Sequence, residues 1–292
     1  VLAEDGLSLA DVDNVYVSHW FDDFSCIEPG KPTWKHWANP DIIDQTTNPG
    51  QSLRDKIVAV SPSFTHHDAH AMSALAFATA YAGEHGLLSL GECLIIVSDG
   101  FGNQEEVVSL YRSDGASTTK IHSLRGYDYS LGLLYQYATA FCGMKENQDE
   151  YKFLGYESHI HEIDFFKRTD PESLAIQTVY VGLIDDYVDN WWEVFLDQKE
   201  QWDSENRPPV KSWQTDISLD KRLKLTRIGV YSFLEKVVSL IIGNHLGPKW
   251  PVRTLVGYTI QKIIEKIYAR LVEHCWIEQK FDTLVLCGGL HY

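Results

Sequence analysis

The sequence lacks the features that mark secreted, membrane-spanning or disulfide-stapled proteins. It has five cysteines among 292 residues, an odd number, and no Cys-x-x-Cys pair. Free thiols in a reducing cytosol fit this usage better than a disulfide framework does. No signal peptide is evident, and apolar runs such as residues 237–242 are far too short to cross a bilayer. We therefore expect a cytoplasmic protein with no membrane partner.

A concentration of positive charge is also missing. The formal net charge is −16, which repels nucleic acid phosphates unless a local basic patch offsets it. The densest basic cluster has helical spacing and is typical of a solvated helix face; it comprises Lys221, Arg222, Lys224 and Arg227. Nucleic acid is accordingly not expected as a partner.

The most informative run that is present is residues 65–71, which read Thr-His-His-Asp-Ala-His-Ala. His66 and His70 are four residues apart, so on a helix they share one face with their β-carbons roughly 5–6 Å apart. Two imidazoles at that spacing can hold one divalent metal ion, whereas His67 and Asp68 point elsewhere and suit roles toward substrate. The His-Glu-x-x-His pattern of zinc proteases is absent. Ordinary core or surface histidines are the alternative interpretation.

Two glycine-containing turns follow predicted buried strands. Residues 99–103 read Asp-Gly-Phe-Gly-Asn after the apolar run 92–98, and Gly288-Gly289 follows the run 281–287. Glycine lets backbone N–H groups approach a phosphate closely, and an aspartate at such a turn can hold a metal-bound water. Each turn is also compatible with an ordinary tight turn. Lys152 lies between acidic residues and a glycine and could reach a phosphate, although such a residue more often lies on a surface loop.

The hydrophobic pattern predicts a mixture of strands and helices, hence an α/β protein. Residues 21–50 are rich in Trp, Pro and Asn and indicate an irregular loop. A domain boundary is expected near residue 90. The predicted strands are residues 12–18, 56–60, 92–98, 107–112, 117–123 and 281–287, with a hairpin turn at Asp114-Gly115. The predicted helices are residues 71–83, 130–141, 172–201, 220–242 and 252–277.

Taken in order, these motifs resemble the O-carbamoyltransferases of antibiotic and nodulation-factor biosynthesis. The family's blocks are His-His-x-x-His-Ala, Asp-Gly-x-Gly, Ser-Leu-Gly-x-x-Tyr, Glu-x-Lys-x-Met-Gly and Gly-Gly, matched at residues 66–71, 99–102, 130–135, 150–155 and 288–289. Leu154 replaces the Met, and Asn103 stands where the family has Glu. Residues 156–159 depart from the family's Ala-x-Tyr-Gly, so the acceptor side of the site is expected to be unusual. The motifs are specific as an ordered set, although each alone is not.

The resemblance implies an actin-like ATPase fold, which is a duplicated ribonuclease H-like architecture shared with the tRNA threonylcarbamoyl transferases. Residues 1–90 would be the remainder of the first actin-like subdomain, and residues 91–292 would be the second, incomplete at its C-terminus. The family's first phosphate loop would precede Val1, and the Asp that completes its metal site would follow Tyr292. The resemblance therefore predicts a fragment, truncated at both ends and inactive alone.

The activity implied by the resemblance is ATP-dependent transfer of a carbamoyl group from carbamoyl phosphate, through a carbamoyl-adenylate, to a hydroxyl of a small-molecule acceptor. ATP and a divalent metal, with iron(II) as one candidate, would be the cofactors. His66 and His70 would bind the metal, and His67 and Asp68 are candidate bases by proximity. Nucleotide and phosphate contacts would come from Asp99, Gly100, Gly102, Lys152, Gly288 and Gly289.

Two other functions stay open. One is a relative of the tRNA threonylcarbamoyl transferases, against which the negative charge and the blocks at residues 130–135 and 150–155 argue. The other is a non-catalytic nucleotide-binding or scaffold protein of the same fold, which the departures at Asn103 and residues 156–158 leave open. The acceptor and the oligomeric state, a homodimer included, do not follow from the sequence.

Overall fold

The structure is a computed structural model, and it describes residues 15–17, 57–59, 65–86, 89–115, 117–205, 218–245, 251–278 and 280–291. The predicted loop at residues 21–50 and Cys26 lie outside the described residues. The chain separates into two compact units, Val1–Ala69 with Gly102–Gln104, and His70–Phe101 with Glu105–Tyr292. The dividing line runs through a single continuous helix, α3 (His66–Glu84), whose first turn is grouped with the first unit.

In the first unit, strands β1 (Val15–Val17) and β2 (Ile57–Ala59) pair in parallel. Both lie inside runs that the sequence predicts to be strands, and both are shorter than predicted. β-branched residues dominate these short segments, as expected of strands. The chain then enters α3.

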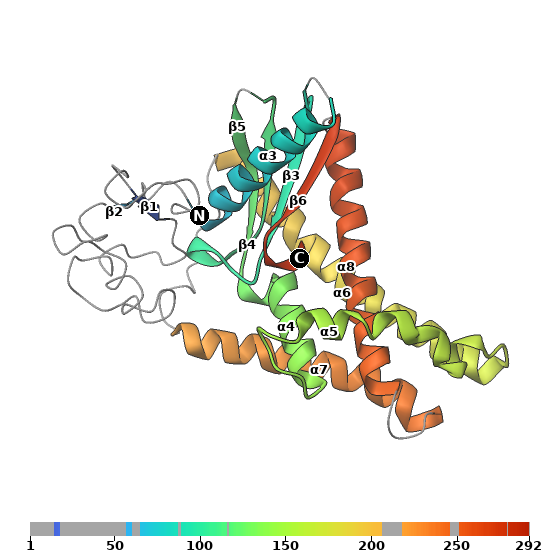
Figure 1. The fold of residues 1–292 in the computed structure, drawn as a ribbon. Coiled ribbons are helices and arrows are strands. Elements are labelled where there is room, and N and C mark those ends of the chain that lie inside the picture. Colours follow the sequence, from blue (N-terminus) through green and yellow to red (C-terminus); the bar gives the residue numbers. More distant parts are fainter. Residues whose placement is uncertain are drawn as a thin grey trace, which may run out of the picture. The chain divides into compact units, whose positions relative to one another are not determined.

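The second unit is built on a mixed sheet of four strands in the order β5-β4-β3-β6 (Figure 1). Strands β3 (Cys93–Ser98), β4 (Glu106–Ser113) and β5 (Thr118–Arg125) form an antiparallel meander, and β6 (Thr283–Cys287) pairs with β3 in parallel. The predicted hairpin turn is confirmed, because the N–H of Ser117 donates a hydrogen bond to Oδ1 of Asp114 at 2.7 Å.

Both faces of the sheet are covered, which explains why β3 is buried along its whole length. Cys93, Ile95 and Val97 pack in one cluster with α3 residues such as Ala71. Leu94 and Ile96 face a larger core that the remaining helices complete. A strand buried on both faces needs a continuous apolar run rather than alternation, and residues 92–98 carry such a run. The α/β class predicted from the sequence is confirmed.

The long helices lie where the hydrophobic pattern predicts them. They are α4 (Leu131–Phe141), α6 (Pro171–Glu205), α7 (Leu219–His245) and α8 (Pro251–Glu278), and a short helix α5 (Glu150–Leu154) follows α4. Short 3₁₀ helices occur at η4 (Asn103–Glu105), η5 (Tyr127–Tyr129), η6 (Glu157–Glu162), η7 (Asp164–Lys167) and η9 (Gly289–His291). None of the helices among the described residues combines the length and apolar character that a membrane crossing requires.

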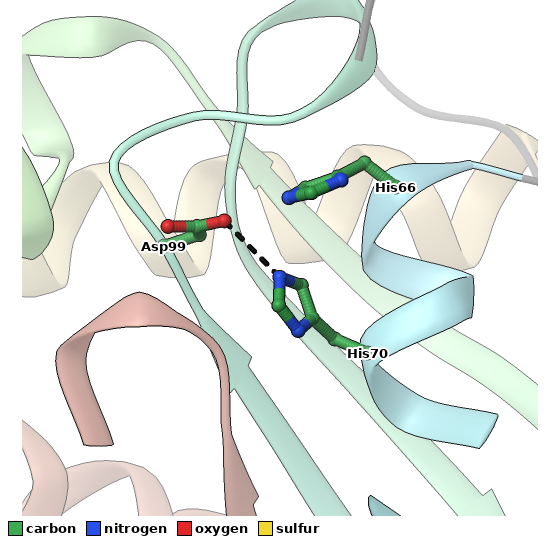
Figure 2. A group of neighbouring side chains, drawn as sticks. All are labelled: His66, His70 and Asp99. Carbon is green, nitrogen blue, oxygen red and sulfur yellow. Dashed lines mark hydrogen bonds and ion pairs between the residues drawn. The ribbon is translucent and has the colours of Figure 1, made fainter. Parts of the chain in front are cut away.

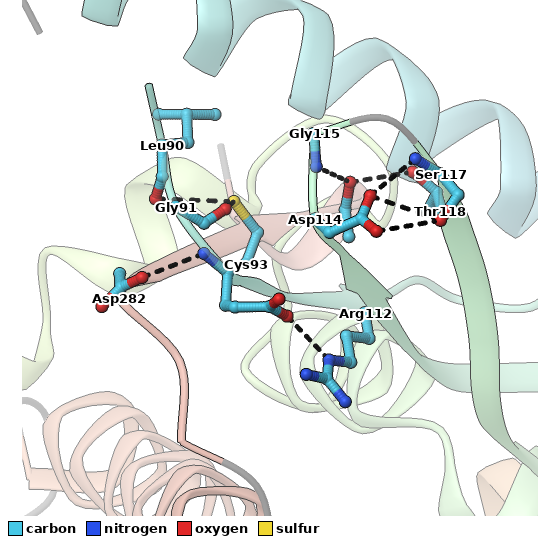
Figure 3. A network of polar contacts seen from close by, with 11 residues as sticks. Leu90, Gly91, Cys93, Arg112, Asp114, Gly115, Ser117, Thr118 and Asp282 are labelled. Carbon is cyan, nitrogen blue, oxygen red and sulfur yellow. Dashed lines mark hydrogen bonds and ion pairs between the residues drawn. The ribbon is translucent and has the colours of Figure 1, made fainter. Parts of the chain in front are cut away.

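Side-chain pairs hold the start of β3 to its neighbours (Figure 3). Oδ2 of Asp282 accepts a hydrogen bond from the N–H of Glu92 at 3.0 Å, and Arg112 Nε donates to Oε2 of Glu92 at 2.8 Å. These contacts fix the register of β6, β3 and β4 at one end of the sheet. At its opposite end, β3 ends at Ser98, where the next loop begins.

Two minor predictions can be compared with the structure. Of the three cysteines in apolar runs that predict buried free thiols, Cys93 and Cys142 are buried and Cys287 is partly exposed. Burial raises the pKa of Cys142 to about 12. The solvated-face prediction for the basic cluster at the start of α7 is confirmed for Lys221 and Lys224, which are exposed. It is wrong for Arg222, whose side chain is 17% exposed and pairs with the buried Glu105.

Candidate functional site

The histidine run forms the first turns of α3 rather than a segment preceding it. Thr65 and Asp68 make a reciprocal capping box, because Thr65 N–H donates to Asp68 Oδ2 at 2.6 Å and Asp68 N–H donates to Thr65 Oγ1 at 3.3 Å. The N–H of His66 donates to Oδ1 of Asn103 at 2.7 Å. Three N-terminal donors of the helix are thus satisfied. The helix therefore begins at His66, and His66 and His70 lie one turn apart on it.

Asp99 stands at the end of β3, where the sheet gives way to a loop. Its backbone N–H still donates to Val107 O at 3.2 Å, and its own Oδ1 accepts from Gly100 N–H at 2.7 Å. The second carboxylate oxygen, Oδ2, lies 3.3 Å from Nε2 of His70. Both side chains are partly accessible, 24% for His70 and 21% for Asp99. A ligand can therefore reach a carboxylate and an imidazole that already face each other.

His66, His70 and Asp99 together offer ligand atoms that all lie within 4.8 Å of one another (Figure 2). The set consists of two imidazoles and one carboxylate, a donor combination that divalent transition metals accept. The sequence identified the two histidines but assigned Asp99 to the nucleotide loop. The available signal was the position of Asp99 at the end of a buried strand, where side chains of open α/β sheets gather.

Three glycines allow the backbone around Asp99 to pack unusually closely. Gly288 has φ +99°, and a Cβ there would overlap the carbonyl oxygen of Ser98. A Cβ at Gly289 would lie 2.7 Å from Asp99 Oδ1. A Cβ at Gly132, near the start of α4, would lie 2.6 Å from the backbone nitrogen of Gly100. The structure thus brings the Gly288-Gly289 turn and the Asp99-Gly100 turn into direct contact.

Ser130 anchors the same loop to α4. Its hydroxyl lies 2.5 Å from Gly100 O, and its Oγ accepts from Leu133 N–H at 3.0 Å as the N-cap of the helix. The Ser-Leu-Gly sequence at residues 130–132 therefore has a geometric basis. The serine caps the helix and holds the loop, and the glycine leaves room for the loop to approach.

The comparison with known families covers the same residues. The family model described as the carbamoyltransferase N-terminus matches residues 37–164. This match supports a member of the carbamoyltransferase family. The match supports a transferase, with carbamoyl transfer as the general chemistry and small molecules as substrates. The matched stretch contains the α3 histidines, the Asp99 loop and the Ser130 cap. No curated protein matches the chain.

The other predicted site residues have different surroundings. His67 is fully buried, and the Asp68 carboxylate serves the capping box of α3. Gly102 is buried within the loop. Lys152 lies on α5 with an exposed side chain whose Nζ is 2.5 Å from Oδ1 of Asp149. This contact raises the pKa of Lys152. The assignments of His67 and Asp68 as bases and of Lys152 as a nucleotide contact stay predictions.

Proposed function

We propose that the chain carries the catalytic centre of an ATP-dependent carbamoyltransferase that forms a carbamoyl-adenylate and passes the carbamoyl group to an acceptor hydroxyl. The observation that supports this most is the meeting of His70 with Asp99 beside the Gly288-Gly289 turn. Two histidines, a carboxylate and exposed glycine backbone are the groups that a metal-assisted reaction of phosphates needs.

The topology of the sheet agrees with an actin-like ATPase fold. An antiparallel meander of three strands, followed by helices and by a strand parallel to the first, is the order of a ribonuclease H-like half. Here β3, β4 and β5 form the meander, and β6 returns beside β3. In such folds, the ligand is expected where the carboxyl ends of the parallel strands meet. The Asp99 and Gly288-Gly289 turns follow the carboxyl ends of β3 and β6.

The donor set fits a divalent metal ion. His66, His70 and Asp99 would hold it, leaving further coordination positions for water or substrate oxygens. A bound ion of this kind would orient a phosphate and offset its charge as a Lewis acid. Iron(II) is the candidate that the family resemblance favours. The protein's own contribution is to hold Asp99 against His70 before any ligand arrives.

The glycine turns fit a nucleotide. Gly100 and Gly289 carry no side chain at the point where the loop after β3 and the turn after β6 meet. Backbone N–H groups at such turns can donate to phosphate oxygens, and the missing side chains allow close approach. Gly288 and Gly289 would therefore leave room for ATP beside the loop that follows β3. Lys152 remains a candidate for a more distant contact.

In the transfer step, the acceptor oxygen would form a bond to the carbamoyl carbon while the bond from that carbon to AMP breaks. The hydroxyl proton must pass to a base. His67 is fully buried, and Asp68 already accepts a hydrogen bond in the cap of α3.

The test is release of AMP from ATP by the purified full-length protein, with and without carbamoyl phosphate. We expect release to require carbamoyl phosphate and to fall at least about tenfold in Asp99→Asn. The matched control is Asp186→Asn, an exposed aspartate on α6 that should leave the rate unchanged. AMP release that is independent of carbamoyl phosphate, or equal in Asp99→Asn and wild type, would contradict the proposal. Threonylcarbamoyl transfer to tRNA would favour the alternative relative instead.

A further inference from the structure

We infer that Arg222 of α7 is a positioning residue for the loop that carries Asp99. Arg222 acts on residues 99–105 through Glu105 and through two aromatic rings. Any effect of this positioning on catalysis rests on the proposed function. The positioning of the loop can be measured whether or not the proposed function is correct.

The end of the loop adopts a backbone conformation that needs support. Gln104 and Glu105 have φ values of +52° and +62°, consecutive left-handed residues that are not glycine. Such conformations are unfavourable for residues with a Cβ, and they persist only where surrounding contacts enforce them. One such contact is the hydrogen bond from Gly126 N–H to Glu105 O at 3.0 Å. It fixes the backbone of Glu105 against the start of η5.

The side chain of Glu105 supplies the second support. Glu105 is 4% exposed, so its carboxylate is removed from water. A buried carboxylate requires a cation or several donors nearby. Arg222 meets this need, because its guanidinium forms an ion pair with Oε1 of Glu105. Loss of the arginine would leave a buried charge at the strained end of the loop.

Arg222 also supports the middle of the loop through the rings of Tyr127 and Phe101. Its guanidinium lies over the ring of Tyr127, 5.2 Å from the centroid. Tyr127 in turn packs edge-to-face on Phe101 with the centroids 5.3 Å apart. Phe101 lies two residues after Asp99, between Gly100 and Gly102. Arg222 therefore supports the loop at two points, directly at Glu105 and through Tyr127 at Phe101.

The helix that carries Arg222 is itself tied to the same region. Thr226, one turn further along α7, donates a hydrogen bond from Oγ1 to Oδ1 of Asp128 at 2.6 Å. Asp128 belongs to η5, as Tyr127 does. Lys221, the immediate neighbour of Arg222, is exposed. The two adjacent basic residues thus differ in their contacts with the loop, which makes Lys221 the matched control.

The experiment compares Arg222→Met, Arg222→Lys and Lys221→Met by hydrogen exchange over residues 99–105 and by titration with cobalt(II). We expect faster exchange in this segment for Arg222→Met and cobalt(II) affinity weakened about tenfold. Arg222→Lys should restore part of both, since it keeps the charge but not the planar guanidinium. Lys221→Met should match wild type in both measurements.

If Arg222→Met does not fold, the double variant Glu105→Gln with Arg222→Met replaces it, because this variant removes both buried charges. We still expect faster exchange over residues 99–105 in the double variant. Exchange over this segment equal to wild type, in whichever variant folds, would overturn the inference. If wild type binds no cobalt(II), the proposed metal site fails. The exchange measurement then decides the positioning role alone.

Discussion

Gly132 of α4 lies against the peptide that joins Asp99 to Gly100. A Cβ at position 132 would approach the backbone carbon of Asp99 to 2.8 Å and the nitrogen of Gly100 to 2.6 Å. Glycine inside a helix is normally less favourable than alanine. At this position, the close approach of the loop outweighs helix propensity. The start of α4 and the Asp99 loop therefore form one packed unit.

Gly132→Ala should destabilise the protein by about 1–3 kcal/mol, because the new methyl group meets backbone atoms that cannot rotate away. The matched variant is Gly229→Ala on α7, where a Cβ would meet no atom within 4 Å. That change should stabilise the helix by up to about 1 kcal/mol. Urea unfolding of both variants measures the difference. Equal effects of the two substitutions would show that the loop does not contact α4 as described.

Asp68→Ala should lower the free energy of unfolding by about 1 kcal/mol, because it breaks the capping box with Thr65. Asp68→Asn keeps a side-chain oxygen for Thr65 N–H and should cost less. Glu84→Ala, at the exposed C-terminal end of α3, is the control and should have little effect. Asp68→Asn that keeps its stability but loses AMP release would instead assign Asp68 the role of base.

His122 should make stability fall with acidification. It is fully buried, its ring packs edge-to-face on Phe195 at 4.8 Å, and neither of its nitrogens has a hydrogen-bond partner among the described residues. Burial, followed by the charges of Lys199 and His274, lowers its pKa from 6.5 to about 3. At a pH between these two pKa values, His122 binds a proton in the unfolded chain but not in the folded protein. Stability from this group is therefore complete above pH 6.5 and is lost as the pH falls toward 3.

His122→Leu removes this proton uptake. Between pH 7 and pH 5, wild type should lose about 2 kcal/mol more unfolding free energy than His122→Leu does. Urea unfolding at the two pH values gives both numbers. Parallel pH dependence in the two proteins would mean that the folded state also protonates His122.

The sequence predicted the elements well and the site only in part. Apolar runs and helical periodicity located β3, β6 and the long helices, because burial on both faces of a sheet demands continuous apolar residues. The start of α3 was placed five residues late, because its cap depends partly on Asn103, which is distant in sequence. Thr65 and Asp68 have the spacing of a capping box and could have indicated the true start.

The position of Asp99 shows why the rest of the site could not be predicted from the sequence. The sequence predicts that His66 and His70 are neighbours, because their contact on a helix depends only on their spacing in the chain. That Asp99 faces His70 depends on how α3 crosses the end of β3, which involves packing between distant segments. The same holds for Gly289, whose closeness to Asp99 follows from the pairing of β6 with β3. Such contacts require the assembled sheet.

The most direct test of the central claim is a calorimetric titration with cobalt(II) of wild type, His70→Ala, Asp99→Asn and the control Asp186→Asn. The account predicts one site in wild type and in Asp186→Asn, and affinity reduced at least about tenfold in the two site variants. Circular dichroism establishes that each variant is folded. Binding in His70→Ala and Asp99→Asn as tight as in wild type would contradict the metal centre, as would the absence of binding in wild type.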